Sequence, residues 1–164
     1  MTDRETTLLL GALRSQREHV VTMVDGLDDE QARRPVLPSG WSCLGLLKHL
    51  AHSDEHYWFA CVVGGEPVDG SLCADGADWR VGDDSTLADL VALYREHGAR
   101  ADTVLAATTL DAPPAYTDPA WETWGMGFPD VRSVVLHVIT ETAVHAGHLD
   151  ATRELIDGRQ WVTL

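Results

Sequence analysis

The sequence predicts an all-α protein built as a four-helix bundle. Three observations lead to this prediction: apolar residues recur at helical spacing in four long stretches, no stretch alternates as a β-strand does, and Gly- and Pro-rich segments separate the stretches. Four such helices in a chain of 164 residues are enough for one bundle around one core. We therefore expect a single domain over residues 1–164.

The first two helices are predicted over residues 4–27 and 43–63, with a turn-rich connector between them. Apolar side chains recur every three or four residues in both stretches, as a helix with one buried face requires. Ser42 stands where an N-cap belongs, because its hydroxyl can accept a free backbone N–H of the first turn. Gly64 and Gly65 end the second helix.

The third helix is predicted over residues 86–107, with Asp84 or Ser85 as its cap. The segment before it, residues 64–84, has no clear period and is expected to be a long surface connection. A link of about 20 residues is long enough to cross the bundle. Simple up-down-up-down order is therefore not assumed.

The last helix, residues 130–157, has the clearest pattern, and Gly158 stands where a helix often ends on a left-handed residue. Gly147 lies inside it at an expected cost of about 1 kcal/mol, which suggests close packing or the approach of a ligand. The segment before it, residues 108–129, is too rich in proline for one regular element; it is either a pocket wall or a loop pinned on the core by Trp121 and Trp124.

Composition excludes some classes of partner. The net charge of −14 argues against nucleic acid, whose phosphates require Lys and Arg, and against a polybasic membrane contact. No apolar run reaches the roughly 18 residues of a membrane span, and the first residues lack the positive charge of a signal peptide. Cys43, Cys61 and Cys73 form no CxxC pair, which suits buried free thiols in the cytoplasm.

Histidine is concentrated on two of the predicted helices. His49, His52 and His56 lie on the second, and His137, His145 and His148 lie on the last. At about 100° per residue, His49 and His56 are about 20° apart, and the last-helix histidines share an arc of about 80° with Glu141. A carboxylate buried among histidines is costly unless it is paired or bound to a metal, and bundle interiors are where facing helices build metal sites.

Helical rise limits which groups can share one ion. His137 and His148 are about 16 Å apart along the axis, so they cannot both be ligands. Glu141 and His145 are about 6 Å apart, as i, i+4 metal-binding pairs are. The candidates that remain open are Glu141 with His145, His145 with His148, and on the second helix either His49 or His52.

Two segments resemble a known superfamily. Residues 40–51, Gly-Trp-Ser-Cys-Leu-Gly-Leu-Leu-Lys-His-Leu-Ala, resemble the GWS-x-LGLLKHLA signature of DinB-like bundles. Residues 141–154 resemble the E-T-x-x-H-A-G-H-x-D-x-x-R-E signature of the same group, which includes mycothiol- and bacillithiol-dependent thiol transferases and maleylpyruvate isomerase. The similarity extends over residues 5–158 and implies up-down-down-up order and a homodimer.

The resemblance also implies a ligand set. The metal ligands of the superfamily fall on His49, Glu141 and His145, with Zn²⁺ as the expected ion and Ni²⁺ or Fe²⁺ as alternatives. Four further residues are expected in the second shell or the pocket wall: His52, His148, Arg153 and Trp124. An ion pair with Asp150 or Glu154 is the alternative role for Arg153.

Two histidines and a carboxylate leave a coordination position open, which is typical of catalytic zinc. An open Zn²⁺ holds a thiol as thiolate at neutral pH. Together with this chemistry, the resemblance implies a metal-dependent thiol S-transferase, with a small thiol of the mycothiol type as cosubstrate and a small electrophile as its partner. The alternatives are a non-haem Fe(II) enzyme with two histidines and one carboxylate, and a metal- or ligand-binding bundle without turnover.

Overall fold

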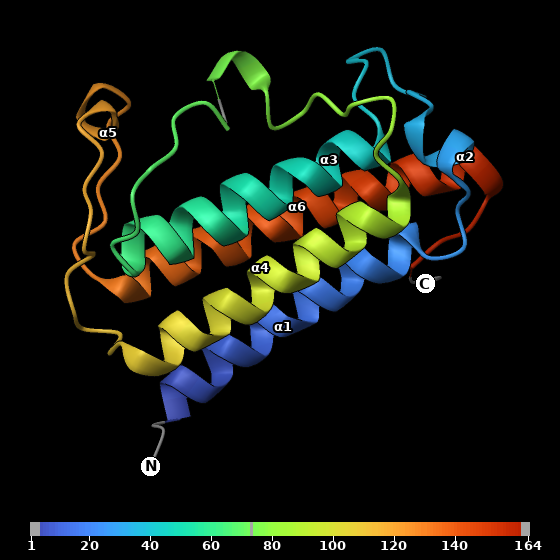
Figure 1. Cartoon of the computed structure of the whole chain (residues 1–164). Coiled ribbons are helices and arrows are strands. Elements are labelled where there is room, and N and C mark those ends of the chain that lie inside the picture. Colours follow the sequence, from blue (N-terminus) through green and yellow to red (C-terminus); the bar gives the residue numbers. More distant parts are fainter. Residues whose placement is uncertain (1–3, 73, 162–164) are drawn as a thin grey trace.

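Four long helices form the frame of the protein in a computed structural model that describes residues 4–72 and 74–161 (Figure 1). They are α1 (Arg4–Val24), α3 (Cys43–His49) continued by η1 (Leu50–Val63), α4 (Leu87–Ala107) and α6 (Val131–Asp157). Three short helices lie in the connections: α2 (Asp29–Arg33), η2 (Ala74–Gly76) and α5 (Ala120–Thr123). The described residues contain no strand, so the predicted all-α class is confirmed.

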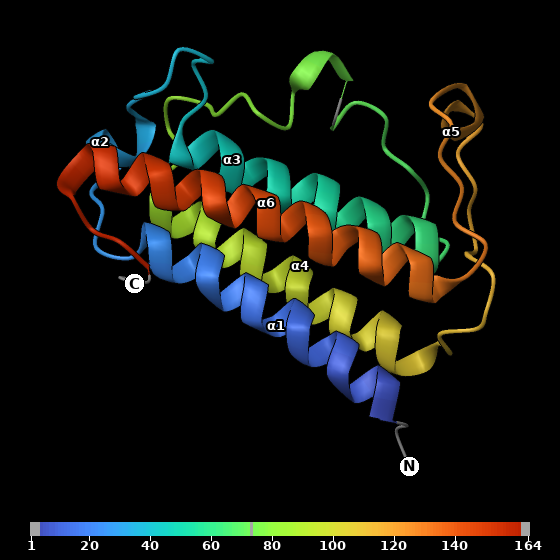
Figure 2. The same ribbon diagram turned by 180° about the vertical axis from the view of Figure 1, so that it is seen from behind.

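The helices follow up-down-down-up order. Helices α1 and α6 run in one direction, and α3–η1 and α4 run in the other (Figures 1 and 2). Each helix therefore packs beside a parallel neighbour, α1 beside α6 and η1 beside α4. This order matches the one implied by the resemblance. No helix among the described residues has the length and apolar character needed to cross a membrane.

Caps fix the ends of the long helices. The Ser42 hydroxyl accepts the backbone N–H of Gly45 at 3.2 Å, as predicted. Helix α4 is capped by Thr86, not by Asp84 or Ser85, because Thr86 and Asp89 each accept a backbone N–H of the other.

The end of α6 is also as the sequence predicts. Gly158 closes the helix with φ +81°, a left-handed conformation that favours glycine. Close packing does not account for Gly147, because a Cβ built there would meet nothing within 4 Å; the approach of a ligand stays a prediction. This glycine is exposed on the outer side of α6, and neither close packing nor a neighbouring side chain explains it.

The second long helix is not α-helical throughout. Its first part, α3, is followed by the π-helix η1, in which each backbone N–H reaches back five residues, as Gly64 N does to Phe59 O at 2.9 Å. A π-helix is wider and turns through a smaller angle per residue. The prediction that His49 and His56 share one face assumed α-helical geometry, and this assumption is wrong beyond Leu50.

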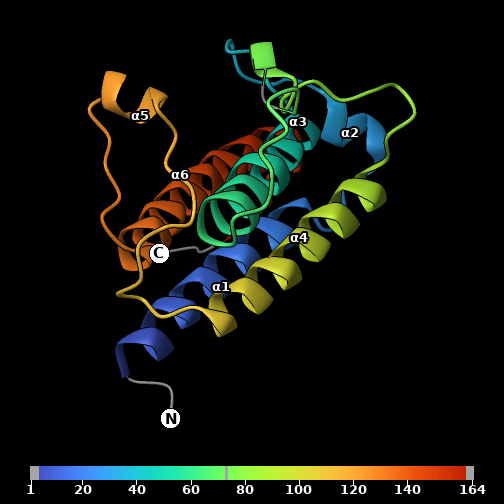
Figure 3. The ribbon, with the colours of Figure 1, turned by 60° about the vertical axis from the view of Figure 1, so that its left-hand side comes forward.

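The link between η1 and α4 runs the length of the bundle, because η1 ends at one end of the bundle and α4 begins at the other (Figures 1 and 3). It returns along the outer side of α3 and η1. The Lys48 ammonium group fixes it by donating to the carbonyls of Ala77 and Arg80 at 2.8 and 2.7 Å. The close approach of the link also requires Gly45, since a Cβ there would lie 2.7 Å from Trp79 O.

Candidate metal centre and adjoining cavity

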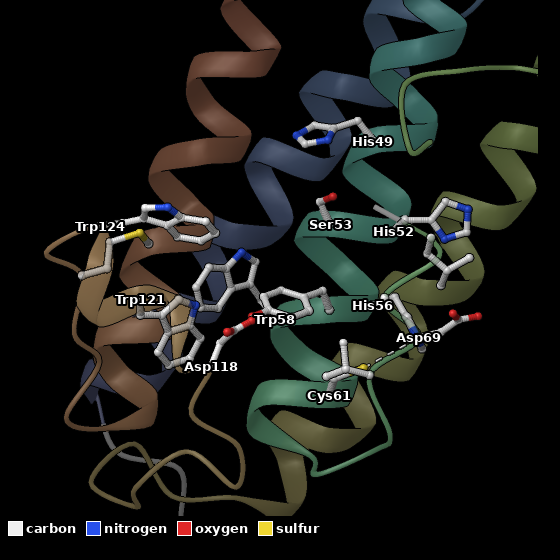
Figure 4. A pocket seen from close by; sticks show the side chains of 15 residues that line it. His49, His52, Ser53, His56, Trp58, Cys61, Asp69, Asp118, Trp121 and Trp124 are labelled. Atoms are coloured by element: carbon white, nitrogen blue, oxygen red, sulfur yellow. Dashed lines mark hydrogen bonds between the residues drawn. The ribbon is translucent and has the colours of Figure 1, made fainter. Parts of the chain in front are cut away.

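The centre of the candidate site is a pair of histidines from two helices. His49 is the last residue of α3, and His145 lies in the middle of α6. Their ring centroids are 5.1 Å apart and the rings meet edge to face. Figure 4 shows His49 projecting from its helix on the side of α6. Two residues separated by 96 positions in the sequence are thus brought together, as the predicted ligand set requires.

The long link holds His49 in place. The Asp78 carboxylate lies 2.5 Å from His49 Nδ1 and also accepts the Ser53 hydroxyl at 2.8 Å. Asp78 is 4% exposed, and the next residue, Trp79, stacks on the His49 ring with centroids 4.2 Å apart. Because an ionised carboxylate only accepts, His49 Nδ1 carries the proton and the Nε2 lone pair stays available.

Sequence reasoning missed Asp78 and Trp79. They lie in a segment with no period and with several other acidic residues, so nothing singled them out. An Asp-Trp pair within reach of a histidine helix is the one signal that the sequence offered. The carboxylate–histidine contact is the usual support of a metal-binding imidazole, since it fixes the ring and its tautomer.

The third predicted ligand, Glu141, is close but not in place. Its Oε2 lies 4.0 Å from His145 Nε2, and its side chain is 43% exposed. As they stand, no three His, Cys, Asp or Glu side chains among the described residues form a group that holds a metal ion. A divalent ion at this pair of rings would therefore require the half-exposed Glu141 side chain to turn toward them.

Electrostatics favour neutral, metal-competent imidazole at His145. Burial lowers the pKa of His145 to about 4, helped by the nearby rings of His49 and His148. The ring is therefore uncharged at neutral pH, and a metal ion has no proton to displace. His148 lies one turn further along α6, is exposed, and places its Nδ1 3.5 Å from His145 Nδ1. It borders the pair and packs against Trp41.

His52 and His56 point away from the pair, toward α4. There they meet His97, with ring centroids 5.6 and 5.1 Å from it (Figure 4). His97 bonds to Ala51 O at 2.8 Å, and His52 Nδ1 is buried without a hydrogen-bond partner. Burial lowers the pKa of both η1 histidines, that of His52 to about 4. The π-helical geometry of η1 accounts for this separation from His49.

Arg153 lies at the end of the bundle and not beside the histidines. It is 3% exposed, pairs with Asp157 at 2.8 Å, and donates to the carbonyls of Met23 and Asp25, each at 2.8 Å. It thereby ties α6 to the end of α1. Neither Asp150 nor Glu154 is its partner, because Asp150 pairs with His19 at 2.7 Å and the guanidinium turns to Asp157.

A cavity of about 470 Å³ adjoins His49 (Figure 4). It lies between η1, the start of the long link and the loop that carries α5. Its walls include Trp58 and Trp121, whose rings stack 5.3 Å apart, and the 67% exposed Trp124 at the surface. Tyr57 donates to Asp118 at 3.0 Å across this space. Trp121 packs on the core and also forms part of the cavity wall, so both predicted roles of this loop apply to it.

A comparison against known families gives a match over most of the chain. The model of the mycothiol-S-transferase family matches residues 8–158. The chain belongs to this family. The DinB-like resemblance is thereby confirmed, because the family is part of that superfamily. Curated proteins and solved structures give no match to the chain.

Membership in the mycothiol-S-transferase family implies transfer chemistry on the mycothiol thiol. It also suggests how the histidine pair and the cavity could act together. A thiol transferase must activate a sulfur and hold an electrophile beside it. The histidine pair and the adjoining cavity are the two features of the described chain that can serve these tasks.

Two of the three cysteines lie among the described residues. Cys43 and Cys61 are both buried, as expected. Burial raises the pKa of Cys43 to about 11, so this thiol is not a nucleophile at neutral pH. Cys61 places its Sγ 3.8 Å from His56 Nε2, beside the cavity. Cys73 lies outside the described residues.

Proposed function

We propose that this chain is a metal-dependent transferase that joins the mycothiol sulfur to a small electrophile, with His49, Glu141 and His145 as metal ligands. One observation carries the proposal: His49 is oriented by a buried carboxylate, Asp78, directly beside His145 and at the mouth of a cavity. A histidine that served packing alone would need no such support. Family membership supplies the thiol.

The donor set fits zinc, with Ni²⁺ and Fe²⁺ as alternatives, and leaves a position for the thiol. A metal ion bound there would lower the pKa of the thiol so that it is a thiolate at neutral pH. Asp78 keeps the proton on His49 Nδ1, and the cavity positions the electrophile. A carbon–sulfur bond forms, the leaving group departs with its electron pair, and the thiol proton passes to solvent.

Metal analysis of tag-free protein tests the ligand set. We expect about one ion per chain in the wild type and loss of most of it in His49→Ala and His145→Ala. The control is His19→Ala, which removes a partly buried histidine that pairs with Asp150 on the other side of α6. Circular dichroism checks that all variants fold. Folded wild type that holds no metal after incubation with Zn²⁺ would refute the metal site.

A thiol-consumption assay separates transferase from passive binder. Mycothiol, bacillithiol and glutathione are each offered with an electrophile to metal-loaded protein. We expect mycothiol consumption that is lost in His145→Ala. Metal binding without consumption of any thiol favours a binding protein, and oxygen-dependent turnover of an iron-loaded form favours the Fe(II) alternative.

We also propose that the chain forms a homodimer and acts in the cytoplasm, where small thiols stay reduced. Support for the dimer comes from α6, on which the large apolar side chains of Leu136, Val144 and Leu155 are 47%, 52% and 58% exposed. Exposed apolar side chains on one helix are typical of an interface. Light scattering after size exclusion should give twice the chain mass of 17.9 kDa; a monomer mass at high concentration contradicts the dimer.

A further inference from the structure

The walls of the cavity are suited to a flat apolar ring. Trp58 and Trp121 stack at an interplanar angle of 19°, and Met126 and Leu72 add aliphatic surface. The volume of about 470 Å³ lies within the range of about 300–1,000 Å³ that is usual for small-molecule sites. Aromatic rings gain from stacking against such walls beyond the area that they bury.

The charge of the cavity disfavours anions. Among the described lining residues are two carboxylates, Asp69 and Asp118, and neither Lys nor Arg. The nearby His52 and His56 have lowered pKa values and stay uncharged at neutral pH. Arg153, the residue expected to bind a substrate carboxylate, is engaged with Asp157 at the end of the bundle. In metal-free protein, a carboxylate on the substrate would therefore find no cationic side chain as its partner in this space.

We propose that the electrophile of this enzyme is an uncharged aromatic compound, whose ring lies between Trp121 and Trp124 with its reactive carbon toward His49. This inference rests on the proposed function. For a halogenated ring, the mycothiol sulfur bonds to the ring carbon, the carbon–halogen bond breaks, the halide leaves with the bonding electrons, and the thiol proton passes to solvent. Dicarboxylic electrophiles are poor substrates.

The thiol is the other candidate occupant, and its chemistry fits a different surface. Mycothiol carries sugar hydroxyl groups, which need hydrogen-bond partners; the tryptophan walls are apolar, and the two cavity carboxylates already accept from Tyr57 and Ser71. A second hollow begins on Trp79, the residue stacked on His49, and is lined by Ser39, Ser42 and Arg80. This hollow offers hydroxyl groups and a guanidinium beside the histidine pair, so the cavity is left to the electrophile.

A matched pair of probes tests the proposal by binding alone. 2-Chloro-1,3-dinitrobenzene and 4-chloro-3,5-dinitrobenzoate differ only by one carboxylate. Calorimetric titration into metal-free protein without thiol should show that the neutral compound binds at least about tenfold more tightly. Trp124→Ala should weaken binding of the neutral compound several-fold, while Trp161→Ala, which removes an exposed tryptophan that stacks on His19, should leave it unchanged. Asp118→Asn should narrow the difference between the two probes.

The outcomes separate the inference about the electrophile from the proposed transferase activity. Equal or tighter binding of the carboxylate overturns the inference, as does an identical response of Trp124→Ala and Trp161→Ala. Stronger binding of mycothiol in a way that depends on Trp124 would assign the cavity to the thiol instead. Because the titration needs neither metal nor turnover, selective binding stands even if the transferase fails. Turnover that ignores the carboxylate refutes the inference and leaves the transferase intact.

Discussion

The orientation of His49 depends on residues that come from a loop. Asp78 accepts at Nδ1 and Trp79 covers one face of the ring, so rotation about the Cα–Cβ bond breaks either a hydrogen bond or a stacking contact. A ring held in this way loses little freedom when it binds an ion. The buried carboxylate also fixes which ring nitrogen faces the second histidine, and so supports metal binding.

Asp78→Asn is therefore expected to weaken zinc binding by roughly 10–100-fold while the protein stays folded. The amide lacks the charge that strengthens the hydrogen bond to His49. A competition titration with a chromophoric chelator measures the affinity. Asp75→Asn is the matched control, since Asp75 is an exposed residue of the same link whose left-handed φ of +51° suits asparagine. Equal affinities in the two variants would show that Asp78 only anchors the link.

At the scale of elements, the pattern of apolar residues was enough to predict the four helices and their ends within a few residues. Capping residues and helix-ending glycines are local signals, and Ser42 and Gly158 behave as such signals require. The π-helix was not predictable, because i→i+5 bonding leaves no separate mark in the spacing of apolar residues. For that reason His52 and His56 were wrongly predicted to share the face of His49. The placement of His49 itself, which precedes η1, was not affected.

The contact between α3 and the link depends on Gly45. We expect Gly45→Ala to lower the free energy of unfolding by about 1–3 kcal/mol and to weaken zinc binding, because the new methyl group would push the link away from His49. Gly11→Ala in α1 is the control; nothing lies within 4 Å of a Cβ there, so stability should rise by roughly 0.5–1 kcal/mol. Chemical denaturation measures both. A stable Gly45→Ala with full zinc affinity would mean that the link is not tightly docked.

At the scale of the whole molecule, η1 carries two adjacent carboxylates into the core. Glu55 is fully buried and accepts hydrogen bonds from Nε and Nη2 of Arg17, at 2.6 and 2.7 Å. Asp54 is 3% exposed, with a single hydroxyl contact from Thr142 at 3.2 Å. Burial and the charge of Glu55 raise the pKa of Asp54 well above its usual value. The bundle thus contains one acid without a cation of its own.

This acid should make stability depend on pH. A raised pKa in the folded state means that folding takes up a proton at Asp54, so the contribution of this group to stability is full below the unfolded pKa of about 4 and is lost as pH rises through the folded value. In metal-free protein, Asp54→Asn should remove this decline. Between pH 4 and pH 7 the free energy of unfolding should fall by at least about 1 kcal/mol less in the variant than in the wild type. Denaturation at several pH values measures it. Parallel curves for the two proteins would contradict the uncompensated acid.

The long link has one further consequence. Its first part, with Val68 and Leu72, lines the cavity, and a few residues later Asp78 and Trp79 hold His49. Any compound that immobilises this segment from the cavity side stabilises the arrangement that the ion selects. Thermodynamic reciprocity then requires that the ion raise affinity for the compound by the same factor. Electrophile and metal are therefore expected to be cooperative ligands, coupled through the link as well as through His49.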